Sequence, residues 1–346
     1  MVPGVAPGPA SGLAGGGAAG TPLVMPTTLV TGGAGFIGSH LVEALLAAGD
    51  RVIVLDDVST GTFANLAAVK SHPALTCIQG SVCDEVAVDE AIQGCHRVVH
   101  LAAAVGVKRI LDRRVGSLVA NVRGTEVVLR AALAHGKLPV FVASTSEVYG
   151  KNDKVPFRED GDHVLGPTSL HRWSYACSKL IDEFLAFAYA AERGLPVVCG
   201  RFFNVTGPRQ SPAYGMVLPR FCTAAAAGRP LDVHGDGTQS RCFLHVLDAV
   251  DAVMLLLGCP QANGLAVNIG SDAEVPIHDL AKRVVARAGS ASPVRLISYA
   301  EAWPQGGFED MRRRLPDTSR LRSLVPWSPR RGLDDIIDGC LADARR

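Results

Sequence analysis

The sequence lacks the features that would place the protein in a membrane, outside the cell or on nucleic acid. No apolar run approaches the roughly 20 residues that a helix needs to span a bilayer. The net charge of +1 comes without the basic stripe of a nucleic-acid binder. Residues 1–25 are rich in Gly, Ala and Pro and lack the basic start and apolar stretch of a secretory signal. We interpret them as a disordered leader.

Paired cysteines are missing as well. The nine cysteines are scattered without a C-x-x-C spacing, which favours reduced thiols and a cytoplasmic protein. His96 and His100 lie four residues apart in HRVVH, but a strand is predicted there, which takes the pair out of ligand geometry, so we predict no metal site. The chain does have core material: 48% of its 346 residues are hydrophobic, enough for one large or two modest domains.

The stretch TTLVTGGAGFIGSHLVEALLAAGDRVIVLDD (27–57) predicts a βαβ unit, in which a glycine turn joins a strand to a helix. Gly32, Gly35 and Gly38 form a GxxGxxG, which lets the backbone approach a pyrophosphate at the helix N-terminus. Such a turn can also simply pack a helix against a strand. Asp56 ends the second strand about 20 residues on, where a carboxylate accepts from both ribose hydroxyls and repels a 2′-phosphate. This context predicts NAD rather than NADP.

Further strands are predicted at LTCIQGSV (75–82), RVVHLAAA (97–104) and LPVFVAST (138–145), with helical segments between them. This alternation predicts an α/β fold with a doubly wound parallel Rossmann sheet, whose ligands lie at the carboxyl ends of the strands. Ser144 to Glu147 lie at one of those ends.

RWSYACSKLIDEF (172–184) places Tyr175 and Lys179 on one helical face. In isolation this YxxxK is an ordinary exposed helix pair. Together with GxxGxxG and STSEVYG (144–150) it resembles the extended short-chain dehydrogenase/reductase family, in its nucleotide-sugar branch, over about residues 27–340. The other matching segments are HLAA (100–103), PFRED (156–160), RFFNVTGPR (201–209), GDGTQSRCF (235–243) and RLPDTSR (314–320).

The resemblance implies two domains. An NAD-binding Rossmann domain would cover residues 26–200, with a return segment at about 238–270. A smaller C-terminal α/β domain, mainly substrate-binding, would cover 201–346, with the sugar between the two. Family members usually dimerise through two helices, here about 114–135 and 174–193, so the resemblance also implies a homodimer.

Catalytic roles follow from the same resemblance. Tyr175 would take the proton of a sugar hydroxyl while hydride passes to NAD, and Thr145 would hydrogen-bond the reacting oxygen. A tyrosine base needs its pKa lowered by about 3 units, which Lys179 and the cationic nicotinamide can supply. The implied cofactor contacts are Gly32, Gly35, Phe36, Ile37, Gly38, Asp56, Ser81, Val82, Leu101, Ala102, Ala103, Tyr175 and Lys179.

On the substrate side, Asn204 and Arg241 match positions that lie near the diphosphate of a nucleotide sugar in this family. Charge-assisted contacts are the natural partners of two phosphates. The alternative for Arg241 is a surface ion pair.

The reaction is indicated by STSEVYG. Simple 4-epimerases of the family typically read S-S-x-x-V-Y-G and 4,6-dehydratases T-D-E-V-Y-G, whereas UDP-glucuronate decarboxylases (UDP-xylose synthases) read S-T-S-E-V-Y-G. Arg172 and Arg314 also match the decarboxylases, in which the latter arginine faces the substrate's carboxylate. The alternative for Arg314 is a solvated run, Arg312–Arg314. Ser146 and Glu147 would orient ring hydroxyls or manage protonation at C5.

The resemblance therefore implies a carboxy-lyase that oxidises C4 of UDP-glucuronate and releases CO₂. Its product would be UDP-4-keto-pentose or, after return of the hydride from recycled NAD, UDP-xylose. A nucleotide-sugar 4-epimerase acting on UDP-glucose or UDP-glucuronate is the main alternative, and a 4,6-dehydratase is less favoured. Tyr175, Lys179 and Thr145 are all present, which disfavours a non-enzymatic NAD-binding module. HLAAAVGVKRIL (100–111) departs from the Ser-Pro-rich segment of UDP-xylose synthases and leaves the C5 substituent open.

Overall fold

The structure is a computed structural model, and it describes residues 1, 4, 25–106, 113–303, 309 and 311–345. The predicted leader, residues 1–25, lies outside the described residues except at three positions. Residues 107–111, the end of the segment that differs from UDP-xylose synthases, also lie outside the described residues. All nine cysteines are described and are free thiols. No helix in the described ranges is both long and apolar enough to cross a bilayer.

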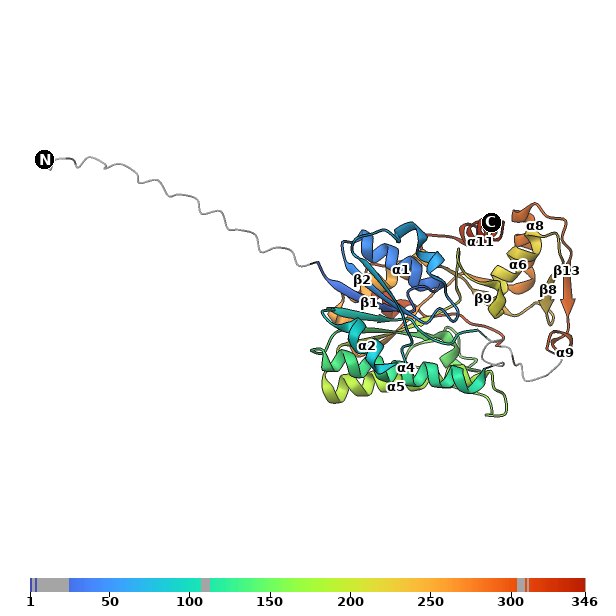
Figure 1. Cartoon of the computed structure of the whole chain (residues 1–346). Helices are drawn as coiled ribbons and strands as arrows, with labels where there is room; N and C mark the ends of the chain where they lie inside the picture. The colour runs from blue at the N-terminus through green and yellow to red at the C-terminus, as the bar shows by residue number, and fades with distance from the viewer. Residues whose placement is uncertain (2–3, 5–24, 107–112, 304–308, 310, 346) are drawn as a thin grey trace.

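A seven-stranded sheet forms the centre of the larger part of the molecule (Figure 1). Its strand order is β11-β6-β5-β4-β1-β2-β3, and all neighbouring strands are parallel. This is the predicted doubly wound Rossmann sheet, with β11 added at the edge beside β6. The strands are β1 (Thr27–Thr31), β2 (Arg51–Asp56), β3 (Leu75–Gln79), β4 (Arg97–His100), β5 (Val140–Thr145), β6 (Val197–Phe202) and β11 (Leu265–Ile269).

Helices cover both faces of this sheet (Figure 1). On one face α1 packs against α7, and on the other α4 packs against both α5 and α2. Gly194 ends α5 with a φ of +65°, the left-handed cap that turns the chain toward β6. The helices are α1 (Phe36–Ala47), α2 (Glu85–Ile92), α4 (Arg114–Ala134), α5 (Trp173–Arg193) and α7 (Val246–Leu257), with the 3₁₀ turns η1 (Phe63–Val69), η2 (Ser146–Tyr149) and η4 (Pro260–Ala262).

A smaller α/β unit lies beside the sheet and has its own core (Figure 1). Leu218 and Phe221 from α6 pack there with Leu280 from α8 and Ile336 from α11. The helices here are α6 (Val217–Ala226), α8 (Ile277–Ala288), α9 (Tyr299–Ala302), α11 (Leu333–Ala344) and the 3₁₀ turn η3 (Pro212–Tyr214). α10 (Ser319–Leu324) packs instead against β11 of the large sheet. Three two-stranded sheets complete the fold: β7 (Val205–Thr206) with β10 (Leu244–His245), β8 (Leu231–His234) with β13 (Val294–Ile297), and β9 (Ser240–Cys242) with β12 (Glu274–Pro276).

Candidate active site

A cavity of about 390 Å³ lies at the carboxyl ends of the parallel strands, within the range of roughly 300–1,000 Å³ typical of small-molecule sites. Its lining runs from Gly32 in the first turn to Arg314 near the C-terminus. All of the predicted site residues line it except Arg241. They are Gly32, Gly35, Phe36, Ile37, Gly38, Asp56, Ser81, Val82, Leu101, Ala102, Ala103, Thr145, Ser146, Glu147, Arg172, Tyr175, Lys179, Asn204 and Arg314.

The three glycines of the turn from β1 into α1, the last of which lies in the first turn of the helix, have different roles. Gly32 has a φ of +72°, and a Cβ there would lie 2.7 Å from the backbone nitrogen of Ala102. A Cβ on Gly38 would collide with the Gly32 carbonyl, so these two glycines serve the packing of the turn. Gly35 has more room and opens α1, whose first turn carries no acidic residue and no side-chain cap. The N–H groups of that turn suit a pyrophosphate.

Asp56 is held at the end of β2 by two backbone N–H groups. Oδ2 accepts from Ala34 at 2.9 Å and Oδ1 from Val58 at 2.8 Å. Burial raises the pKa of Asp56, and these hydrogen bonds oppose the rise. Each oxygen keeps a further lone pair, so the carboxylate fits two ribose hydroxyls and would repel a 2′-phosphate. Together with the uncapped N-terminus of α1, it fits NAD.

Tyr175 and Lys179 project from α5 into the cavity. Tyr175 shares a hydrogen bond with Thr145 at the end of β5. Lys179 is buried, and its ammonium donates to Asp182 at 2.9 Å. Burial, and then the charge of Lys179, lowers the pKa of His100 to about 3, so this histidine is neutral. The positive charge of this region therefore belongs to Lys179 and not to His100.

The protein's own groups raise the pKa of Tyr175. Burial is the main cause and the negative charge of Glu147 is the next, while the Thr145 hydrogen bond and Arg314 oppose them. Lowering the pKa of Tyr175 for base catalysis therefore needs positive charge beyond that of the chain, which the nicotinamide of NAD carries.

Glu147 bridges two buried arginines. Its Oε2 accepts from Arg172 Nη2 at 2.8 Å, and its Oε1 accepts from Arg314 Nη2. The side chains of Arg172 and Arg314 are 4% and 10% exposed, so water screens these contacts little. Burial alone would raise the pKa of Glu147, but the two guanidinium groups outweigh it and lower the pKa to about 2. The cluster thus contains one carboxylate and two cations, with one net positive charge.

Two buried polar atoms of the cavity, Ser146 Oγ and Arg314 Nε, have no hydrogen-bond partner among the described residues. Leaving such atoms unsatisfied is costly, so a ligand oxygen beside them would be stabilised. Both atoms belong to residues adjacent to, or paired with, Glu147.

Residues 28–270 match the sequence pattern of the NAD dependent epimerase/dehydratase family, which covers more than half of the chain. The protein belongs to this family. The predicted membership, the Rossmann fold and the NAD cofactor are thereby confirmed.

Individual members of the family are similar over most of the chain. A UDP-N-acetyl-alpha-D-glucosaminuronate decarboxylase of Bacillus cytotoxicus is 40% identical over 306 residues, covering 87% of this chain and 92% of that protein. UDP-glucuronic acid decarboxylase 1 of Xenopus tropicalis is 31% identical over 304 residues, covering 87% of this chain and 68% of that protein. The structure of DesIV, a dTDP-glucose 4,6-dehydratase from Streptomyces venezuelae with NAD and TYD bound, has a TM-score of 0.81 and 30% identity, covering 92% and 96%.

Within this family site, the two residues assigned to the diphosphate are placed differently. Asn204 lines the cavity, but its Nδ2 donates to the Cys242 carbonyl at 2.9 Å and its Oδ1 accepts from Arg314 at 3.4 Å. Arg241 does not line the cavity; it is buried, and its Nη1 donates to the Ser240 carbonyl at 2.7 Å. Its burial also argues against a surface ion pair. The diphosphate role of both residues stays a prediction.

The run Arg312–Arg314 does not behave as one solvated patch. Arg313 is half exposed and pairs with Glu274 at 2.8 Å. Arg314 points the other way, into the cavity. The alternative of a solvated Arg314 is therefore wrong for this fold.

Some residues of the site were not selected from the sequence. Asp182 pairs with Lys179 one helical turn away, a spacing that was visible in the sequence. Arg209 lines the cavity and donates to Glu43 at 2.7 Å, a contact that no local pattern signals. His100, considered as a metal ligand with His96, instead bonds the hydroxyls of Thr31 and Thr125.

Proposed function

We propose that the protein is an NAD-dependent decarboxylase of a UDP-hexuronate, with UDP-glucuronate as the predicted substrate. The observation that carries the proposal is the Glu147–Arg172–Arg314 cluster. Its net positive charge is buried in the cavity, close to Tyr175, and it suits one additional carboxylate. A neutral sugar would leave that charge without a ligand partner.

The chain's residues divide the reaction between them. NAD, when bound, supplies the hydride acceptor at C4 and the hydride that is later returned. Tyr175, hydrogen-bonded to Thr145, takes the proton of the C4 hydroxyl. The C5 carboxylate is then β to a ketone and leaves readily as CO₂, while Tyr175 and Thr145 stabilise the enolate oxygen. Arg314 orients the carboxylate, and Ser146 is available to a ring hydroxyl or to protonation at C5. The product is UDP-4-keto-pentose, UDP-xylose or both.

The ion-paired cluster argues against a 4,6-dehydratase and against a 4-epimerase of UDP-glucose. A 4,6-dehydratase needs a base that removes the C5 proton, but both oxygens of Glu147 are ion-paired and its pKa is lowered to about 2. A 4-epimerase of UDP-glucose has no carboxylate for the arginines to bind. Epimerisation of UDP-glucuronate would keep the carboxylate and is the stronger of the remaining alternatives.

The test is incubation with a panel of UDP- and TDP-sugars, with products identified by mass spectrometry. The panel includes UDP-glucuronate and its 2-acetamido counterpart, because relatives named for both sugars match the chain. Loss of CO₂ from either supports the proposal. Loss of water would establish a dehydratase, an unchanged mass with a new sugar an epimerase, and no turnover despite bound NAD a binding module.

The predicted homodimer and cytoplasmic location belong to the same proposal. Large apolar side chains are exposed on α4 and α5, among them Val115 at 76% and Phe184 at 71%. Apolar side chains gathered on adjacent helices favour a protein interface, and two such pairs can form a four-helix bundle. The unpaired cysteines favour a reducing compartment.

The packing of the helices and strands supports the proposed division into domains at residue 200. α7 packs against α1, and β11 pairs with β6, so part of the second half contributes to the large sheet. This arrangement favours a return segment within residues 238–270.

A further inference from the structure

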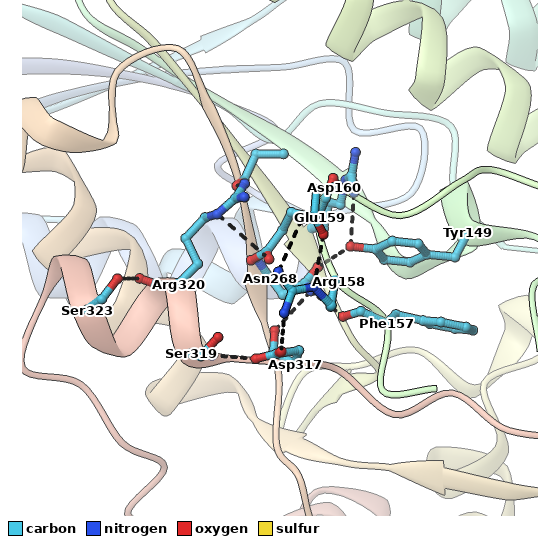
Figure 2. Close-up of polar contacts among 12 residues, drawn as sticks. Tyr149, Phe157, Arg158, Glu159, Asp160, Asn268, Asp317, Ser319, Arg320 and Ser323 are labelled. Carbon is cyan, nitrogen blue, oxygen red and sulfur yellow. Dashed lines mark hydrogen bonds and ion pairs between the residues drawn. The ribbon is translucent and has the colours of Figure 1, made fainter. Parts of the chain in front are cut away.

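Asn268, near the end of β11, is completely buried, and the hydrogen-bonding groups of its side chain are all engaged. Its Oδ1 accepts from Tyr149 Oη at 2.7 Å, and its Nδ2 donates to the Phe157 carbonyl at 2.9 Å and the Asp317 carbonyl at 3.0 Å. Figure 2 shows these three partners around Asn268. One side chain therefore joins three separate segments of the chain.

Two of these segments carry the catalytic ion pair. Tyr149 follows Glu147 by two residues within η2, and Asp317 follows Arg314 by three. Phe157 links the two segments. Its ring stacks on Tyr149 with centroids 4.7 Å apart, and its backbone bonds to Leu315 at 2.7 Å and to Asp317 at 2.9 Å.

The orientation of the Asn268 amide is fixed by the charge network behind it. Arg201 donates to Tyr149 Oη at 2.9 Å and is held by Glu183 at 2.7 Å. Because Tyr149 Oη accepts from Arg201, its single proton is free for Asn268 Oδ1. The amide nitrogen must then face the two carbonyls, a geometry that an aspartate cannot reproduce.

The segment from Arg314 to Asp317 lies outside the helices and strands. Its backbone is held by the bridge between Phe157 and Pro316 and by the hydrogen bond from Asn268 to the Asp317 carbonyl. β11, in contrast, is paired along its length with β6 in the large sheet. Asn268 thus connects a segment without regular secondary structure to a strand of the large sheet.

We propose that Asn268 is a positioning residue, which holds the Arg314 segment against η2 so that Arg314 meets the substrate's carboxylate. The proposal rests on the function proposed above. It assigns Asn268 no contact with the substrate, since its partners are protein groups and it does not line the cavity.

The experiment measures affinities for UDP-glucuronate and for UDP-xylose by calorimetry, in NAD-loaded protein that carries Tyr175→Phe so that C4 oxidation does not consume the substrate. Asn268→Ala should reduce the preference for the carboxylated sugar by about tenfold, a size common for coupled neighbours, while NAD and UDP-xylose binding stay unchanged. In an Arg314→Ala background, Asn268→Ala should cause no further loss of preference. A merely structural role would instead weaken all ligands and add to the effect of Arg314→Ala.

Two further variants keep the test decisive. Tyr149→Phe retains the stacked ring but removes one donor to Asn268, so it should shift the preference in the same direction by a smaller factor, even if Asn268→Ala fails to fold. Val267→Ala is the matched control, because this buried neighbour on β11 packs in the core and should lower stability without changing the preference.

An unchanged preference in folded Asn268→Ala or, where that variant does not fold, in Tyr149→Phe would overturn the positioning role. So would an equal shift in Val267→Ala. Failure of the proposed function is a different result: the unmodified protein would then release no CO₂ from either uronate sugar.

Discussion

Replacing Glu147 by glutamine removes the charge that Arg172 and Arg314 share but keeps the size of the side chain. Lowering the pKa of Glu147 from 4.5 to about 2 corresponds to about 3 kcal/mol in favour of the ionised form in the folded protein. Breaking a buried ion pair by removing one partner typically costs about 3–5 kcal/mol. We therefore expect Glu147→Gln to lower the free energy of unfolding by about 3 kcal/mol at neutral pH.

The stabilisation that Glu147 contributes should depend on pH in a defined direction. The pKa of Glu147 is lower in the folded than in the unfolded protein, so its contribution is complete above 4.5 and is lost as pH falls toward 2. The difference in unfolding free energy between the two proteins should stay constant from about pH 8 to about pH 5 and narrow below. Urea denaturation followed by circular dichroism measures it. Glu85→Gln is the control, since Glu85 also pairs with two arginines but at the exposed surface, and it should change stability little.

Glu147→Gln should lower stability but raise the affinity for a carboxylated sugar. Without Glu147 the two guanidinium groups hold an incoming carboxylate more tightly, so the affinity for UDP-glucuronate should rise relative to UDP-xylose. Release of CO₂ should slow, by about 10²-fold, because the ground state is stabilised over the transition state. A stability difference that changes between about pH 5 and 8 would refute this reasoning, because Glu147 would then titrate near neutrality. So would an unchanged preference between the two sugars.

Three other variants test the remaining assignments. Asp56→Ala should weaken NAD binding and relax discrimination against NADP, and equal affinity for both cofactors in the unmodified protein would contradict the assignment. Tyr175→Phe should lower the rate of C4 oxidation about 10²–10⁴-fold with NAD still bound, and a rate close to the original would exclude this base. Phe184→Glu, on the exposed face of α5, should shift the proposed dimer toward monomer in analytical ultracentrifugation, whereas a molar mass that this substitution leaves unchanged would argue against that interface.

The sequence predicts those parts of the site that are local in the chain. The GxxGxxG turn and Asp56 belong to one βαβ unit, and the pattern of that unit is sufficient to place them. The strands predicted at 75–82, 97–104 and 138–145 are present as β3, β4 and β5, each shorter than predicted. After β4, for example, Leu101 to Ala103 leave the sheet and line the cavity. Helical spacing places Tyr175 and Lys179 on one face, but their place in the site follows only from the family resemblance.

The charge cluster could not be predicted in this way. Glu147 is 25 residues from Arg172 and 167 from Arg314, and their pairing arises only when η2, α5 and the Arg314 segment meet. In the sequence Arg313 and Arg314 look equivalent. Only the folded chain distinguishes them, because Arg314 meets Glu147 inside the cavity and Arg313 meets Glu274 at the surface. The same holds for Asn268, whose three partners lie 119, 111 and 49 residues away from it along the chain.

The position of β11 has a consequence for the order in which the molecule is made. During synthesis β6 is complete before residues 265–269 leave the ribosome, so until then one edge of the large sheet carries unpaired backbone groups. Such an edge can recruit strands from other chains. A nascent or truncated chain that ends before Leu265 also lacks Asn268 and the Arg314 segment. Aggregation and loss of turnover should therefore appear together in incomplete chains and disappear together once this strand is in place.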